Sequence, residues 1–192
     1  MKRTIRSLVT AAILIVGARN VMAIEEAAYK VVEKEDAFEL RDYAPHILAE
    51  TVVEGSLEDA GNQAFRLLFQ YISGDNGTHG KVAMTAPVGQ RPAQEKWAVS
   101  FMMPAAYTLG TLPAPADPKV ALRPVPARRV AAVRYSGFWS EKSYLQSKAR
   151  LEAWIRIKGF TVAGEPIWAR YNPPFTPWFL RRNEILIPVD VK

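Results

Sequence analysis

Alternation between apolar and polar positions predicts short strands along most of the chain after residue 28. In residues 46–54, for example, Ile47, Ala49, Thr51 and Val53 share one parity. Alternation of this kind is typical of a strand with one buried face. The predicted strands cover residues 29–34, 38–43, 46–54, 81–88, 97–103, 120–125, 129–135, 167–171 and 184–189.

A helical period predicts a first helix that follows Ser56 and runs to about Ile72. Ser56 and Asp59 have capping-box spacing, in which the serine side chain accepts a hydrogen bond from a free backbone N–H. Gly74 is placed to end this helix. Spacings of three and four residues produce one apolar face, made of Ala60, Ala64, Leu67, Leu68, Tyr71 and Ile72.

A second helix is predicted from Glu141 to Lys158, with Ser140 before it and Gly159 after it. The order strand, glycine, helix, strand, proline loop, strand then occurs twice along the chain. The two copies have similar lengths, because Gly55 to Pro87 spans 32 residues and Gly137 to Pro173 spans 36. The pattern predicts an α+β domain of two pseudo-twofold βαββ repeats, with antiparallel strands and two helices.

The first 23 residues have the features of a secretory signal peptide. Lys2, Arg3 and Arg6 precede a short apolar stretch over residues 8–18, and Val21-Met22-Ala23 ends the segment with small residues. We therefore expect cleavage after Ala23, a periplasmic or otherwise exported protein, and a single domain over residues 24–192. An uncleaved membrane anchor is the alternative, but the apolar stretch is short for a span of about 20 residues. After cleavage, no stable membrane insertion is expected.

Charge and cysteine content restrict the function further. Residues 1–23 hold four of the 25 basic residues and none of the 19 acidic ones, so the remainder has a net charge of about +2. Nucleic-acid binding is not expected, because it needs clustered basic residues on one face. The chain contains no cysteine, which excludes cysteine zinc sites, iron–sulfur clusters and thiolate or CxxCH heme attachment.

Catalytic patterns are lacking in the sequence. Its two histidines, His46 and His79, belong to no HExxH motif, and no GxSxG or GxxxxGK[ST] motif occurs. Adjacent carboxylates such as Glu25 and Glu26 diverge on a helix or strand. We therefore predict a binding protein rather than an enzyme.

Aromatic residues give the clearest indication of a ligand. Phe65 and Phe69 widen the apolar face of the first predicted helix. A second aromatic group lies near arginines, and it consists of Tyr171, Phe175, Trp178 and Phe179 beside Arg170, Arg181 and Arg182. Apolar walls with a few cations suit a flat ligand with acidic edges, such as a tetrapyrrole. Composition alone favours the simpler explanation that these side chains fill the core and rim of the domain.

Several segments resemble motifs of the SOUL heme-binding protein family. Lys81–Val88 (KVAMTAPV) is similar to its K-[IV]-x-M-T-x-P-V signature, and Phe38–Tyr43 to its YE[IV]R.Y strand. Arg170–Pro174 and Arg181–Glu184 are similar to its C-terminal GY-[ND]-x-P…RRNEV segment. The resemblance runs from about Tyr29 to Val189. It implies two βαββ repeats that form a distorted, barrel-like antiparallel sheet with two helices, and binding of heme or free porphyrin.

The resemblance transfers few site residues. Asp42 stands where one branch of the family has an axial histidine. In the other branch the first helix forms a heme-binding groove with basic residues near the propionates, and here Asn62, Gln70 and Thr176 occupy those positions. His46, four residues after Asp42, is then a candidate weak iron ligand.

We expect non-covalent binding of heme or porphyrin, with Phe65, Arg66 and Phe69 forming one wall. Two alternatives stay open. One is a binder of other flat hydrophobic or cationic molecules in the cleft between the repeats, and the other is a tetrapyrrole-modifying enzyme.

Overall fold

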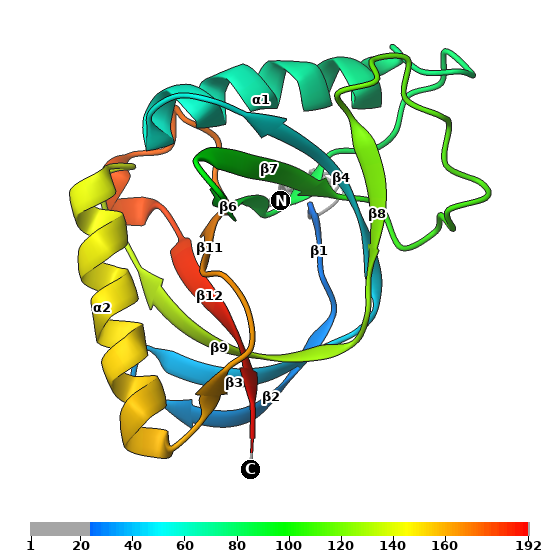
Figure 1. The fold of residues 1–192 in the computed structure, drawn as a ribbon. Coiled ribbons are helices and arrows are strands. Elements are labelled where there is room, and N and C mark those ends of the chain that lie inside the picture. Colours follow the sequence, from blue (N-terminus) through cyan, green and yellow to red (C-terminus); the bar gives the residue numbers. More distant parts are fainter. Residues whose placement is uncertain (1–23, 192) are drawn as a thin grey trace, which may run out of the picture.

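The computed structural model describes residues 24–191, and it shows a strongly curled antiparallel sheet with two helices on its outer face (Figure 1). The sheet contains β2 (Tyr29–Glu35), β3 (Phe38–Tyr43), β4 (His46–Val53), β6 (Val88–Ala93), β7 (Lys96–Met102), β8 (Ala121–Val125), β9 (Arg128–Tyr135), β10 (Thr161–Val162), β11 (Ile167–Arg170) and β12 (Asn183–Asp190). The helices are α1 (Leu57–Ser73) and α2 (Glu141–Lys158). The predicted signal peptide lies outside the described residues. Among those residues, no helix is long and apolar enough to cross a membrane.

Strand order confirms the predicted pseudo-twofold architecture. The sheet runs β2-β3-β9-β12-β11-β6-β7-β4-β8, with β10 pairing with β12. One half is β4-α1-β6-β7 and the other is β9-α2-β11-β12. They meet where β6 pairs with β11, with Gly89 opposite Ala169. The α+β fold with two βαββ repeats is therefore confirmed.

Two bent segments cross from one half to the other and curl the sheet. β3 pairs with β9 and β4 pairs with β8, all antiparallel. Because β3 leads directly into β4, and β8 into β9, the two segments lie side by side through their bends. At the bend Tyr43 lies opposite Arg128, and His46 lies opposite Val125.

Both helix starts and both helix ends follow the predicted caps. The Ser56 hydroxyl accepts a hydrogen bond from the Asp59 backbone N–H at 3.1 Å, and the Ser140 hydroxyl accepts one from Ser143 at 3.3 Å. Gly74 ends α1 in the left-handed region, as a residue without a Cβ atom does readily. Local side-chain chemistry thus fixes the bounds of the helices.

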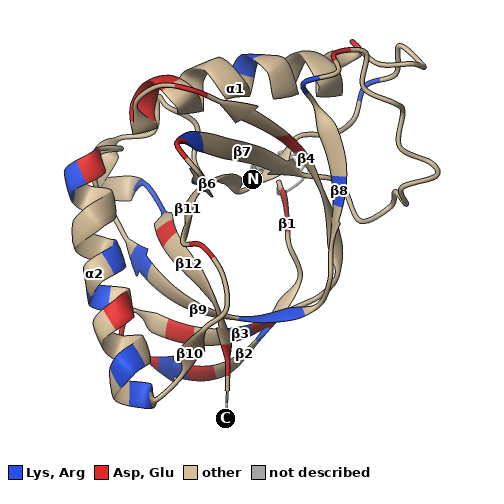
Figure 2. Cartoon of the chain, viewed as in Figure 1, with Lys and Arg blue, Asp and Glu red and all other residues tan. Residues whose placement is uncertain are grey.

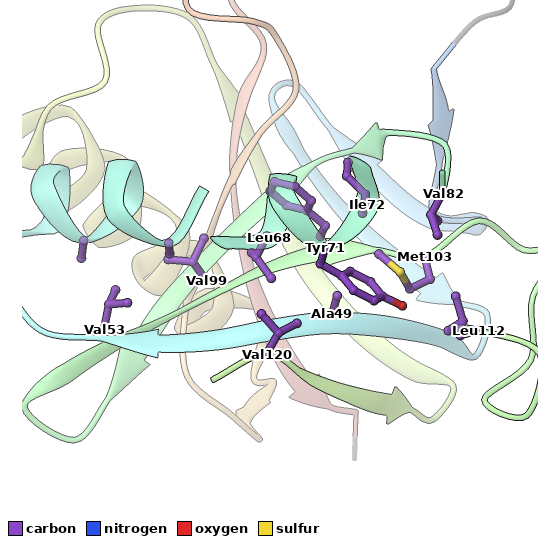
Figure 3. Close-up of a cluster of buried hydrophobic side chains, with 13 residues drawn as sticks. Ala49, Val53, Leu68, Tyr71, Ile72, Val82, Val99, Met103, Leu112 and Val120 are labelled. Atoms are coloured by element: carbon purple, nitrogen blue, oxygen red, sulfur yellow. The ribbon is translucent and has the colours of Figure 1, made fainter. Parts of the chain in front are cut away.

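Burial of α1 and α2 makes two cores on the outer face of the sheet. Ala60, Ala64 and Leu68 of α1 are fully buried and pack with Ala49 and Val99 of the strands (Figure 3). In the second core, α2 contributes four side chains that pack on Trp168 and Ile185, namely Tyr144, Leu151, Trp154 and Ile155. A third cluster lies on the opposite, inner face of the curl and includes Tyr43, Val130, Ala132, Ala169 and Leu186.

The predicted strand over residues 81–88 is wrong in its extent. Only β5 (Thr85–Ala86) is extended and paired, in parallel with β1 (Glu25–Glu26), and β6 begins after Pro87. Pro87 has no N–H for a strand ladder, which separates the two strands. Val82 instead packs into the α1 core, and its N–H donates to Ile72 O at 2.8 Å.

Candidate functional site

An apolar groove of about 530 Å³ lies between α1, the segment around β5 and the loop after β11. This volume falls within the range typical of small-molecule sites. Aromatic and other apolar side chains supply most of its walls, namely Phe65, Phe69, Met84, Val88, Trp139, Pro173 and Pro174. We call this cavity the α1 groove. Its volume and lining suit a small apolar ligand.

Phe65 and Phe69 form one wall of the α1 groove. Their four-residue spacing places both rings on one side of α1, stacked with centroids 5.8 Å apart and planes at 12°. Phe65 also meets Phe101 edge-on at 5.2 Å. The two rings stay 38% and 49% exposed, while Ala64 and Leu68 fill the core behind them. The widened apolar face therefore serves the groove rather than the core.

Arg170 ends β11 and lines the α1 groove from the sheet. Its guanidinium lies near Trp168 and Trp139, at 4.9 and 5.5 Å from their ring centroids. Its Nη2 donates to Gln90 Oε1 at 3.2 Å. No carboxylate within residues 24–191 pairs with it. Burial lowers the pKa of Arg170 to about 10. The cation therefore lies among aromatic side chains without a counter-charge.

Gly61 makes room for this guanidinium. A Cβ atom at Gly61 would lie 3.1 Å from both Nη atoms of Arg170 and 3.0 Å from Gln90 Oε1. Gln90 is held in place because its Nε2 donates to the Leu57 carbonyl at 2.7 Å. A glycine inside a helix costs about 1 kcal/mol relative to alanine, and the close approach of Arg170 explains its presence here.

A buried ion network supports the rim at Tyr171. The Tyr171 hydroxyl donates to Glu184 at 3.0 Å, and Arg182 stacks 3.7 Å above the Tyr171 ring. Glu184 is fully buried and receives hydrogen bonds from Arg41 at 2.6 and 3.2 Å and from Arg182 at 3.0 Å. Burial opposes ionisation of Glu184, but Arg41 and Arg182 hold its pKa below the ordinary value. The network links two of the sequence motifs and fixes the start of the loop.

Three of the predicted site residues come together, and His46 lies elsewhere. Phe65, Arg66 and Phe69 all line the α1 groove. His46 lines a small cavity of about 60 Å³ on the inner face of the sheet. Its Nδ1 is 2.9 Å from Ala44 O, and burial lowers its pKa. This cavity is far smaller than typical ligand sites.

The other positions singled out by the sequence are dispersed. Asn62 lines the α1 groove, whereas Gln70 borders a separate depression with Val52 and Lys96. Asp42 forms a bidentate pair with Arg129, at 2.6 and 2.8 Å. Four aromatic side chains do not line the groove and are exposed. One precedes α2 and three follow Pro174, namely Phe138, Phe175, Trp178 and Phe179.

Sequence reasoning missed the roles of Trp139, Met84 and Gly61. Arg170 was noted as a neighbour of the aromatic group and as part of a family motif, but not as a residue of the groove. One signal was present, since Arg170 follows Trp168 by two residues and so shares its strand face, which contacts the helices. Its approach to α1 depends on the pairing of β6 with β11, which no local pattern reveals.

Comparison with known proteins places this geometry in a family. A family model described as "SOUL heme-binding protein" matches residues 24–188. Heme-binding protein 1 of Mus musculus is 26% identical over 142 residues, which cover 70% of this chain and 74% of the relative. Heme-binding protein 1 of Xenopus tropicalis is 25% identical over 157 residues, 78% of this chain and 82% of the relative.

Solved structures share the fold at low identity. The EcmrR C-terminal domain aligns with a TM-score of 0.65 and 11% identity, over 85% of this chain and 99% of that domain. A structure described as a hydrolase from Listeria innocua aligns with a TM-score of 0.58 and 10% identity, over 83% of this chain and 94% of that one. These likenesses concern the fold alone.

Proposed function

This chain belongs to the SOUL heme-binding protein family, and we propose that it holds heme or a free porphyrin non-covalently in the α1 groove. The proposal includes export, which rests on the signal-peptide features of residues 1–23. Phe65 and Phe69 would contact the apolar face of the tetrapyrrole. Arg170 would meet a propionate, and Arg66 would contribute a second cation near the groove.

The uncompensated guanidinium of Arg170 carries the proposal. A partly buried cation without a counter-charge is costly, and a ligand carboxylate would offset that cost. A tetrapyrrole offers carboxylates on an otherwise flat apolar body, which matches aromatic walls with a cation among them. The guanidinium also argues against flat cations as ligands, because like charges repel in a site of low polarity.

A binding role is favoured over a catalytic one. The titratable side chains on the groove walls are those of Arg66, Arg170 and Tyr171. Burial raises the pKa of Tyr171 further above its ordinary value, and Arg170 stays protonated near neutral pH. General acid–base catalysis works best with a group whose pKa lies near the operating pH. Heme, when bound, would supply the iron chemistry, and these residues would bind and orient it.

A titration with matched porphyrins tests the proposal. In the dimethyl ester of protoporphyrin IX, methyl groups on the two propionates remove both negative charges while the macrocycle stays the same. We expect the free acid to bind more tightly to the wild type, and Arg170→Gln to lose about 10- to 100-fold for the free acid. The ester should be nearly insensitive to this variant. Arg156→Gln, an exposed arginine on α2, is the control and should match the wild type for both ligands.

Binding would be followed by porphyrin fluorescence and, for hemin, by the Soret band. Absence of saturable binding of both hemin and protoporphyrin would refute the proposed function. Equal losses for acid and ester in Arg170→Gln would refute the propionate role of Arg170 while leaving the groove itself as the site.

A further inference from the structure

A second cavity, of about 1010 Å³, lies on the inner face of the sheet and shares no lining residue with the α1 groove. Arg91 of β6, Arg123 of β8 and Arg128 of β9 line it. Side chains alternate across a strand, so these arginines face inward while Gln90 and Leu122 contact the helix side. Figure 2 shows basic residues on β8 and at the start of β9. We call this cavity the arginine cavity.

Four arginines line the cavity, since Arg129 of β9 does so too; three of them have a carboxylate partner, and Arg128 has none. Arg91 and Arg123 both reach Glu50, at 2.9 and 3.1 Å. Neighbouring Arg129 is held by Asp42. Among residues 24–191, Arg128 forms no ion pair or side-chain hydrogen bond, and its Nε atom is buried. The Nε of Arg123 is also buried without a partner.

Local charge around Arg128 is positive. Burial is the main cause of a lowered pKa at Arg128. The nearby charges of Arg123 and Arg91 lower this pKa further, whereas Tyr43 raises it. Three carboxylates also line the cavity: Asp42 is paired with Arg129, and Glu165 and Asp190 are exposed. None of the three is among the groups that act on the pKa of Arg128. Of the guanidinium groups that line the cavity, two thus pair with Glu50 and one with Asp42, while that of Arg128 pairs with neither.

Such an arrangement is unfavourable without a ligand. Like charges in partly buried surroundings repel, and buried N–H donors without acceptors each cost free energy. Guanidinium groups present forked donors that match the oxygen atoms of carboxylates and phosphates. A bound oxyanion would satisfy the Nε donors of Arg123 and Arg128 and neutralise the excess charge.

We propose that Arg91, Arg123 and Arg128 form a second ligand site that binds a small, doubly charged oxyanion. The ligand chemistry is that of a phosphate or a dicarboxylate. The site lies on the opposite face of the sheet from the α1 groove, and its occupation does not depend on tetrapyrrole binding.

Calorimetric titration of the protein without porphyrin tests this site. Inorganic phosphate and malonate are the probes, each at constant ionic strength maintained with sodium chloride. Saturable binding of either ion supports the site and identifies the oxyanion class. Neither ion binding up to about 10 mM, where a millimolar Kd would be visible, would overturn it.

Arg128→Met is the decisive variant, because it removes the unpartnered charge and keeps an apolar stem. We expect at least about a tenfold weaker Kd. The melting temperature without anion should rise, since an unpaired cation is removed, while the rise on adding phosphate is lost. Arg134→Met, at an exposed position near the other end of the same strand and outside the cavity, should behave as the wild type. Unchanged phosphate affinity in Arg128→Met would refute the assignment.

A measurement on the wild type covers the case in which Arg128→Met does not fold. The ¹H–¹⁵N resonances of the arginine Nε groups should respond to phosphate at the two buried Nε positions, those of Arg123 and Arg128. Arginine Nε groups outside the cavity, such as that of Arg156, should not respond. Shifts confined to exposed arginines would refute the site. Because no porphyrin is present, this outcome is independent of the proposed function.

Discussion

Replacing Gly61 with alanine tests whether the Arg170 guanidinium occupies the α1 groove beside α1. In an ordinary helix interior, alanine is more stable than glycine by about 1 kcal/mol. Here the added Cβ would lie 3.0–3.1 Å from Gln90 Oε1 and from both Nη atoms of Arg170. Trp139 and Trp168 limit the movement of the guanidinium. Overpacking of this kind costs about 1–3 kcal/mol.

The two effects oppose each other, so we expect Gly61→Ala to change the free energy of unfolding by about 0 to −2 kcal/mol. Displacement of Arg170 should also weaken the binding of free-acid protoporphyrin by about tenfold. Urea unfolding and porphyrin titration measure these quantities. Gln63→Ala, on an exposed position of α1 outside the groove, is the control and should keep full affinity. A Gly61→Ala protein that is stabilised by the full propensity gain and binds normally would show that the guanidinium lies elsewhere.

Four further predictions follow from individual side chains. Phe65→Ala and Phe69→Ala should each weaken porphyrin binding by about 1–3 kcal/mol, with little loss of stability because both rings are partly exposed; an unchanged affinity in the double variant would mean that another wall holds the ligand. Because His46 lies outside the groove, we expect hemin and protoporphyrin to bind with similar affinity, and His46→Ala should change neither these affinities nor the hemin Soret band. A change in the spin state of the iron would contradict this. Ser56→Ala should lower the free energy of unfolding by about 1 kcal/mol in urea titrations. Glu184→Gln should cost about 3–5 kcal/mol, because its arginine partners lose their buried counter-charge. The pKa of Glu184 is lowered on folding, so its contribution is full at neutral pH and is lost as the pH falls below about 4; the same acid-dependent loss in Glu184→Gln would refute this.

Local chemistry explains which parts of the fold could be predicted. The bounds of α2 follow from Ser140 and Gly159, whose capping interactions involve near neighbours only. The segment 81–88 was predicted less well because its apolar residues look like strand positions. Val82 is in fact buried against α1, and Pro87 interrupts the ladder. Short edge pairs such as β10 with β12 depend on tertiary contact and leave no local pattern.

The α1 groove was predictable only as far as it lies on one helix. Phe65, Arg66 and Phe69 are brought together by helical geometry alone. Arg170 lies about 100 residues later in the sequence and reaches α1 through the β6–β11 pair. Its missing counter-charge is a property of the assembled site, so the sequence could mark the residue but not its electrostatic role.

The pseudo-twofold repeat raises the question of why residues of α1 line the α1 groove while those of α2 do not, and side-chain size next to the caps gives an answer. Four residues after the caps, α1 has Ala60 where α2 has Tyr144. The Tyr144 side chain is buried, with its ring centroid 5.9 Å from that of Trp168, and it fills the space between α2 and the sheet. Gly61 places no side chain between α1 and Arg170, and the space beside it remains as the groove. The two halves therefore differ in side-chain size: large side chains on α2 complete a core, whereas small ones on α1 leave room for a ligand.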